Sequence, residues 1–180
     1  DELAAIREKS RRLLAPGPHA LTPAVQNVLN TYTAAYTHRS SEFKVCYARA
    51  ADLLRELFSL TDEFTPLVFG HTGSYNWEMV VTNTPDAYRT VGMDLGAFSS
   101  KWVQVFKNKG RAIDVLRADP GTGINTTTWR DALEKSYDLA LITHNETSTG
   151  VALPLQELCE IARETSPNTL VAVDGVSIAG

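Results

Sequence analysis

Long hydrophobic runs, excess basic charge and cysteine are all scarce in this sequence. No apolar run approaches the length that a membrane-spanning helix requires. The 17 basic side chains are outnumbered by 21 acidic ones, which gives a net charge of −4 at pH 7. Because nucleic acids and anionic membranes are bound by basic surfaces, we expect neither as a partner. The charged, helix-prone start DELAAIREKSRRLL is not typical of a signal peptide, and we expect a cytoplasmic protein.

The two cysteines, Cys46 and Cys159, both fall within predicted helices. Such a pair indicates reduced, buried small hydrophobic residues in a protein of the cytosolic type. Neither lies in a loop beside a histidine, which disfavours a catalytic cysteine, and no metal site is predicted. The 180 residues, 43% of them hydrophobic, are enough for the core of one domain or of a large piece of one.

Helical and strand-like segments alternate along the chain. Helices are predicted at 2–14, 21–30, 40–60, 74–83, 99–110, 127–136 and 153–166. Strands are predicted at 67–70, 88–93, 112–117, 138–144 and 169–174, and the apolar first and last of these are expected to be buried. This alternation predicts an α/β fold in which a mostly parallel sheet carries helices on both faces.

Ligands of such a sheet bind at the carboxyl ends of its strands. The segments expected there are HTGS (71–74), the stretch after Met93, HNETSTG (144–150) and Asp174. In HTGS, a turn glycine precedes a helix, so exposed amides and the Thr72 and Ser74 hydroxyls form a candidate anion cradle, or simply a helix cap. The segment lacks the Gly-Lys-Ser/Thr ending of a Walker motif.

The other three segments each have two interpretations. Phe98 opens a helix just beyond a strand, where it is either a core aromatic or part of a ligand site. In the polar run HNETSTG, His144 and Glu146 either face a ligand or hold the loop in place. Asp174 ends an apolar strand with no basic residue nearby in the sequence, so either a ligand nitrogen or a neighbouring turn is its partner.

Taken together and in this order, these segments resemble the class V aminotransferases, especially the alanine/serine–glyoxylate and phosphoserine aminotransferases. The resemblance extends over essentially the whole chain. It rests on LLAPGPHALTPAV (13–25), HRSSEF (38–43), HTGSYNWE (71–78), GAFSSKW (96–102), THNETSTGV (143–151) and VDGVSIAG (173–180). It implies the three-layer α/β/α large domain of pyridoxal-phosphate (PLP) enzymes of fold type I, the fold of aspartate aminotransferase.

The resemblance also implies roles for particular residues in binding PLP. The turn Thr72, Gly73 and Ser74 would hold the phosphate, and Phe98 would stack on the pyridine ring. Thr147 would bond the ring's 3′ oxygen, Val176 would cover the other ring face, and Asp174 would pair with the ring nitrogen. A carboxylate there keeps the nitrogen protonated, which suits a cofactor that acts as an electron sink. Arg39 would reach the anionic group of the substrate.

Two features depart from the family pattern. Tyr75 and Asn76 stand where relatives mostly carry small residues, so either their bulk crowds the phosphate turn or Tyr75 points away from it. The lysine that forms the family's Schiff base follows the aspartate by one strand, and no lysine follows Asp174 in this sequence. We therefore expect residues 1–30 to be an N-terminal arm with the first helices and 31–180 to be the N-terminal part of the large domain, with the small domain absent.

Three explanations of the missing lysine are open: a truncated sequence, a split protein whose second chain carries the C-terminal half, or a degenerate, non-catalytic relative. The activity implied is transfer of an amino group from a small amino acid (alanine, serine or phosphoserine) to a 2-oxo acid such as glyoxylate or pyruvate. A cysteine desulfurase or lyase of the same fold is the alternative. The family also implies a homodimer.

Overall fold

The computed structural model describes residues 20–31 and 37–179. The helix predicted at 2–14 lies outside these residues. The chain divides into two units, residues 1–56 and 57–180, and each is described by itself. The predicted domain boundary at residue 30 stays a prediction. Of the helices in the described ranges, none combines the length and apolarity needed to cross a membrane.

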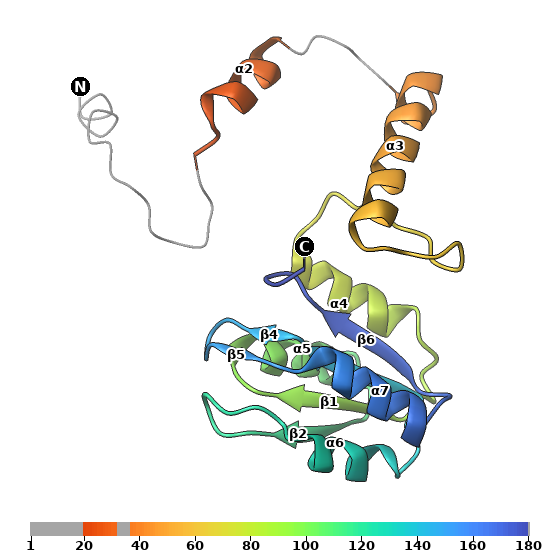
Figure 1. Ribbon diagram of the computed structural model, residues 1–180, viewed down its shortest axis with the longest axis vertical. Coiled ribbons are helices and arrows are strands. Elements are labelled where there is room, and N and C mark those ends of the chain that lie inside the picture. Colours follow the sequence, from red (N-terminus) through yellow and green to blue (C-terminus); the bar gives the residue numbers. More distant parts are fainter. Residues whose placement is uncertain (1–19, 32–36, 180) are drawn as a thin grey trace, which may run out of the picture. The chain divides into compact units, whose positions relative to one another are not determined.

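The first unit contributes two helices, α2 (Pro23–Thr31) and α3 (Ser41–Leu57) (Figure 1). Proline opens α2, where its missing N–H is not needed. Ser40 caps α3, because its hydroxyl accepts a hydrogen bond from the amide of Phe43 at 3.1 Å. Both helices match the prediction, but Cys46 on α3 is exposed, so its predicted burial is wrong.

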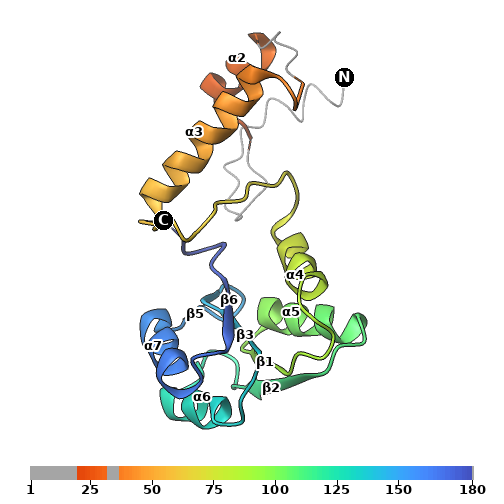
Figure 2. The same cartoon turned by 90° about the vertical axis from the view of Figure 1, so that its right-hand side faces the viewer.

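The second unit is built on a parallel four-stranded sheet with the strand order β2-β1-β3-β6. Its strands are β1 (Thr90–Asp94), β2 (Ile113–Arg117), β3 (Leu139–Thr143) and β6 (Leu170–Asp174). Its helices are α4 (Gly73–Thr82), α5 (Ala97–Asn108), α6 (Thr126–Leu133) and α7 (Leu155–Thr165). Figure 2 shows α4 and α5 on one face of the sheet and α6 and α7 on the other, which confirms the predicted arrangement.

The central strand β3 shows how the sequence produces two cores. Its side chains alternate between the two faces of the sheet, as strand geometry requires. Leu139 and Leu141 join the cluster under α4 and α5, whereas Ala140 and Ile142 join the cluster under α6 and α7. A strand covered on both sides is apolar at every position, which is why LALIT reads as a continuous run.

Two strand predictions are wrong in part. Residues 67–70 form no strand, and Leu67, Val68 and Phe69 are exposed. An apolar extended segment becomes a strand only when a neighbour completes its hydrogen bonds, and no described strand lies beside it. Strand β6 forms, but among the described residues it pairs with β3 alone and leaves Leu170 54% and Val173 41% exposed, so here it is an edge strand and not a buried one.

The polar run after β3 contains structure that the sequence did not predict. Residues Asn145–Glu146 (β4) and Val151–Ala152 (β5) pair as a small antiparallel hairpin. The remaining residues of the run, 147–150, form its turn, in which Gly150 has a φ of +74°. The loop is therefore held in a defined shape above the sheet.

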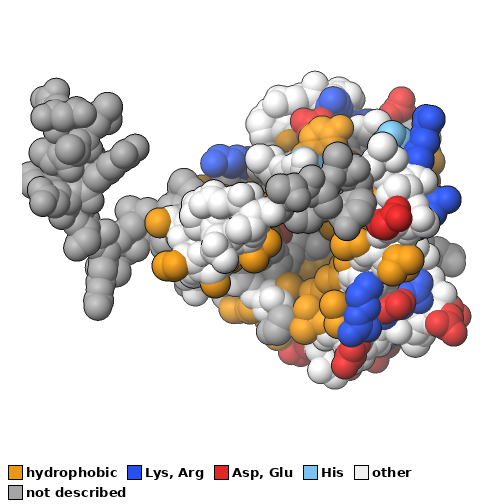
Figure 3. All heavy atoms as spheres, turned by 90° about the horizontal axis from the view of Figure 1, so that it is seen from above, with side chains coloured by type: hydrophobic (Ala, Val, Ile, Leu, Met, Phe, Trp, Pro, Cys, Tyr) orange, Lys and Arg blue, Asp and Glu red, His pale blue; other side chains and the backbone are white. Residues whose placement is uncertain are grey.

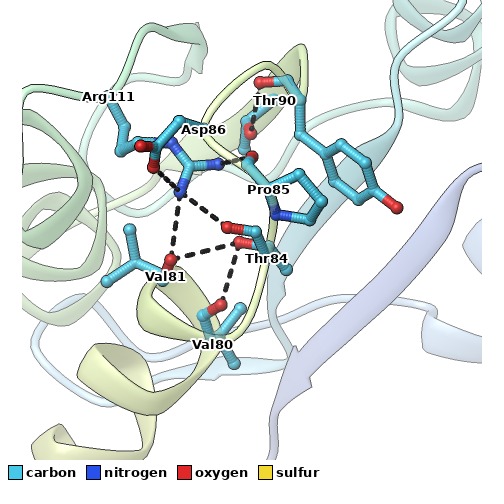
Figure 4. A network of polar contacts seen from close by, with 8 residues as sticks. Val80, Val81, Thr84, Pro85, Asp86, Thr90 and Arg111 are labelled. Carbon is cyan, nitrogen blue, oxygen red and sulfur yellow. Dashed lines mark hydrogen bonds and ion pairs between the residues drawn. The ribbon is translucent and has the colours of Figure 1, made fainter.

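A buried arginine fixes the end of α4 against the sheet (Figure 4). Arg111, just before β2, donates to the carbonyl oxygens of Val81 and Thr84, each at 3.0 Å, and to that of Pro85. It also pairs with the carboxylate of Asp86 at 3.2 Å. These contacts tie the end of α4 and the chain between α4 and β1 to the sheet.

Candidate functional site

The ends of three neighbouring strands gather the predicted segments at one edge of the sheet. Because β1, β3 and β6 are parallel, the loops that follow them all emerge on the same side. The amide of His144, after β3, donates to the carbonyl of Asp174 at the end of β6 at 2.9 Å. The side chain of Asn145 donates to the hydroxyl of Ser177 at 2.9 Å. The HNETSTG loop and the loop after Asp174 are thus held together.

A buried carboxylate joins the HNETSTG loop to the start of α5. Glu146 is 0% exposed and accepts hydrogen bonds from the amides of Phe98 and Ser99 at 3.1 and 2.8 Å. It also accepts from the Ser99 hydroxyl at 2.9 Å and from the Ser148 hydroxyl at 2.6 Å. Burial raises the pKa of Glu146, but the bonds from Ser148, Ser99 and Phe98 outweigh it, and the pKa is lowered. Glu146 is therefore ionised and acts as a cap for α5.

The close approach of these two segments explains the glycine before α5. A Cβ atom on Gly96 would lie 2.5 Å from the hydroxyl oxygen of Ser148 and 2.8 Å from Cγ of Glu146. The hydroxyl of Thr149 adds a bond to the carbonyl of Leu95 at 3.1 Å. Only a residue without a side chain leaves room for this contact. Of the two interpretations of Glu146, the geometry supports the structural one.

Asp174 has a different environment at the same edge. Its Oδ2 accepts a hydrogen bond from the indole nitrogen of Trp77 at 3.0 Å, and its Oδ1 accepts one from the amide of Val176 at 3.1 Å. None of the ion pairs among the described residues involves Asp174. The carboxylate is oriented by neutral donors, and no cation within the described chain neutralises it.

The side chain of Asp174 lines a cavity of about 240 Å³. Ten residues form its wall: Gly73, Asn76, Trp77, Val80, Trp102, Ala172, Val173, Asp174, Gly175 and Val176. The cavity is mostly apolar apart from the carboxylate. Small-molecule sites typically measure roughly 300–1,000 Å³, so this cavity would enclose part of a ligand and leave the rest at the open edge.

The turn Thr72, Gly73 and Ser74 lies across the start of α4, and its three residues are divided between two cavities. Gly73 faces the Asp174 cavity, and a Cβ atom built on it would lie 3.6 Å from Cγ2 of Val176. Thr72 and Ser74 line a second cavity of about 430 Å³ that Lys101 also lines. The structure therefore brings only one residue of the turn to the Asp174 cavity.

The two bulky residues of this segment have different positions. Tyr75 lines the second cavity and is 54% exposed, and its ring packs on His71 with the ring centres 4.7 Å apart. It therefore points away from the Asp174 cavity, whereas Asn76 lines it. Tyr75 shares the second cavity with Thr72 and Ser74, so whether its bulk crowds the phosphate turn stays a prediction.

The remaining predicted residues lie outside the lining of the Asp174 cavity. Phe98 is 40% exposed at the start of α5, with the ammonium of Lys101 5.3 Å from its ring centre. Thr147 is exposed in the turn between β4 and β5. Arg39 is exposed ahead of α3 in the first unit. His144 lines a different groove, with Leu153 and residues of α7, although its backbone is bonded to that of Asp174.

The sequence did not single out Trp77, which contacts Asp174 directly. Two features of Trp77 could have indicated a role: it lies one helical turn after the HTGS turn, and the N–H group of a buried indole usually has a hydrogen-bond partner. Its partner could not be predicted, because the two residues are 97 positions apart.

Comparison with known proteins identifies the family and the fold. Residues 15–180 match the family model described as aminotransferase class-V. Alanine–glyoxylate aminotransferase 1 of Saccharomyces cerevisiae is 28% identical over 93% of this chain and 45% of its own length. Serine–glyoxylate aminotransferase of Hyphomicrobium methylovorum is 30% identical over 93% of this chain and 42% of its own. The crystal structure of phosphoserine aminotransferase from Cytophaga hutchinsonii has a TM-score of 0.75 and 26% identity over 91% of this chain and 45% of its own.

The chain belongs to the class V aminotransferase family, because the family model matches most of its length. Its α/β fold is that of the large domain of PLP enzymes of fold type I, as the structural match shows. Both predictions are thereby confirmed. The chain spans less than half the length of the relatives named above.

Proposed function

We propose that the complete protein is a PLP-dependent aminotransferase. It would transfer an amino group from a small amino acid of the alanine, serine or phosphoserine type to a 2-oxo acid such as glyoxylate or pyruvate. Family membership supports the reaction class. The observation that carries the proposal is the Asp174 carboxylate, which lines a largely apolar cavity at the carboxyl edge of the sheet without an ion-pair partner among the described residues.

The residues around this cavity fit a ligand with a protonated ring nitrogen. A carboxylate at the end of a strand has a fixed direction, and here two neutral donors hold both of its oxygens. A cationic N–H is the partner that such a group lacks. Val176 and Gly73 meet beside it, so the glycine leaves space that a side chain would fill.

The chain's own residues would bind and orient the cofactor. Asp174 would hold the ring nitrogen and its proton, Val176 and Phe98 would cover the ring, and Thr147 would bond the ring oxygen. Thr72, Gly73 and Ser74 would bind the phosphate through amides and hydroxyls at the start of α4. When bound, PLP supplies an electron sink for the loss of the substrate's α-proton. The base that moves this proton, the Schiff-base lysine of the family, stays a prediction for a part of the protein outside this sequence.

The proposal also includes a substrate-binding role for Arg39, a homodimer and a cytoplasmic location. The substrate role of Arg39 and the homodimer have only the family as support. A cytoplasmic location is consistent with Cys46 and Cys159, which are both free thiols. Analytical ultracentrifugation and cell fractionation are the respective measurements for the oligomer and the location.

Purified full-length protein supplied with PLP provides the test. We expect an absorption band at the border of the visible and ultraviolet ranges that borohydride bleaches, and conversion of glyoxylate to glycine with alanine or serine as donor. A protein that stays colourless and takes up no PLP would contradict the proposal. Incubation with cysteine is the matched assay, since release of sulfide without transfer to glyoxylate would favour the desulfurase alternative.

A further inference from the structure

Two tryptophans line the Asp174 cavity, and only one of them has a hydrogen-bond partner. Trp77 on α4 and Trp102 on α5 stack with their ring centres 6.1 Å apart and an interplanar angle of 16°. The indole nitrogen of Trp77 donates to Asp174, whereas that of Trp102 is buried without a partner among the described residues. The two indoles therefore share the cavity but differ in their relation to the carboxylate.

Packing holds Trp77 in one position. It is 7% exposed and belongs to the core cluster that contains Val81, Phe106 and Leu141. An aromatic ring fixed in a dense core keeps its rotamer, so the N–H group has a fixed direction as well. The contact joins the first helix after the HTGS turn to the strand end 97 residues later.

The two bonds to Asp174 leave part of the carboxylate available. An ionised carboxylate can accept about four hydrogen bonds. The indole of Trp77 occupies one site on Oδ2 and the amide of Val176 occupies one on Oδ1. One site on each oxygen remains, and the side chain lines the cavity. A ligand N–H can therefore bond to Asp174 without displacing either protein donor.

The chemistry of the indole suits this arrangement. Tryptophan is a donor only, carries no charge and does not ionise at ordinary pH. A lysine or arginine in its place would neutralise Asp174 and compete with a cationic ligand. A hydroxyl could rotate and accept instead of donate. The indole fixes the plane of the carboxylate and leaves its full negative charge for the ligand.

We infer that Trp77 is a positioning residue, which orients Asp174 toward the protonated ring nitrogen of the bound cofactor. The inference rests on the proposed function and adds to it a residue that acts through Asp174. Trp102 serves as the internal comparison, because it contributes a ring to the same cavity and has no bond to the carboxylate.

The test uses full-length protein, freed of cofactor, and the variants Trp77→Phe and Trp102→Phe. Pyridoxamine 5′-phosphate labelled with ¹⁵N in its ring is the probe, because it carries an amine where PLP has its aldehyde and so reports non-covalent binding alone. Trp77→Phe removes a bond to a charged group, so we expect its dissociation constant to rise about tenfold. The ring ¹⁵N resonance should move toward the unprotonated position in that variant. Trp102→Phe should change both quantities much less.

A measurement without ligand covers the case in which Trp77→Phe does not fold. A ¹H–¹⁵N spectrum of the wild type should include indole resonances from Trp77, Trp102 and Trp129. Asp174→Ala removes the acceptor of Trp77 at a partly exposed position, so the Trp77 resonance should move farthest. The Trp129 resonance should stay in place, because that indole donates to the carbonyl of Leu158 in the other core cluster, at 2.9 Å.

The outcomes separate this inference from the proposed function. If the wild type binds the probe and Trp77→Phe matches Trp102→Phe in affinity and in ring ¹⁵N shift, the positioning role is wrong and the proposed function stands. An unmoved Trp77 resonance in Asp174→Ala would also overturn it. If the wild type itself does not bind the probe, the proposed function fails and the inference fails with it.

Discussion

Two carboxylates at the same edge of the sheet, Glu146 and Asp174, differ in how completely the protein satisfies them. Glu146 is 0% exposed and accepts bonds from the amides and hydroxyls of Ser99 and Ser148 and from the amide of Phe98. Asp174 accepts two bonds and lines a cavity. The first carboxylate is fully used by the fold, and the second keeps acceptor capacity for a ligand.

The number of hydrogen bonds that each accepts distinguishes a carboxylate with a structural role from one that can still accept bonds from a ligand, although both follow strands. A buried charge is stable only when hydrogen bonds or an opposite charge compensate it. Glu146 finds this compensation at the start of α5, and its pKa is accordingly lowered. Asp174 finds only part of it in the described chain. Loss of Glu146 should therefore affect folding most, and loss of Asp174 should affect binding most.

Substitution of Asp174 should give the largest effect. In full-length protein, Asp174→Ala removes the proposed partner of the ring nitrogen, and we expect the affinity for pyridoxamine 5′-phosphate to fall roughly 100-fold, or about 2.7 kcal/mol. Fluorescence titration measures the affinity. The exposed Asp131 on α6 is the control, since Asp131→Ala removes the same charge on the other face of the sheet. Equal affinities of the two variants would contradict the role of Asp174.

Substitution of Glu146 should give the second-largest effect, which we expect on the stability of the fold. Glu146→Gln places an amide N–H₂ against amides that need an acceptor, so we expect the free energy of unfolding to fall by about 2 kcal/mol. Urea denaturation measures it. Glu134→Gln on the surface is the control, because that side chain is exposed and its loss should change little.

The stability difference between the wild type and Glu146→Gln should also depend on pH. The pKa of folded Glu146 lies below its ordinary value of 4.5, so its contribution to stability is present above 4.5. The contribution is lost as the pH falls from 4.5 through the lower pKa of the folded protein. Urea midpoints at several pH values should therefore converge in acid, and a constant difference would argue against an ionised Glu146.

The substitution Gly96→Ala, which adds a methyl group, should give the smallest effect of the three substitutions. The new Cβ would meet the side chains of Ser148 and Glu146, so we expect the free energy of unfolding to fall by about 1 kcal/mol. Thermal or urea denaturation measures this change. Gly73→Ala is the matched variant at the other carboxylate, where the nearest atom, Cγ2 of Val176, is at an ordinary 3.6 Å. If Gly73→Ala destabilises the protein more than Gly96→Ala, the assignment of the tighter contact to Glu146 is wrong.

In the view of Figure 3, Lys and Arg side chains lie among Asp and Glu side chains, and neither sign of charge covers a large area. Such a mixed surface gives no directional signal for a charged partner.

Most helices and strands of the second unit could be predicted because their hydrophobic periodicity agrees with their burial. The helix at 99–110 and the strand at 138–144 correspond to α5 and β3 within a few residues. The segment 67–70 could not be predicted in the same way, because an apolar run specifies extended backbone but not a neighbour to pair with. The hairpin of β4 and β5 was missed because each of its strands has only two residues, too few to show a periodic pattern.

The sequence was enough to predict the family, the alternation of helices and strands, and the grouping of the segments after β1, β3 and β6 at the carboxyl edge of a parallel sheet. Those features follow from local periodicity and from the fixed direction of parallel strands. Only the tertiary structure decided that Glu146 is a buried cap, that Tyr75 faces away from Asp174, and that Trp77 holds its carboxylate. These outcomes depend on contacts between residues far apart in the chain, which packing selects and local sequence does not encode.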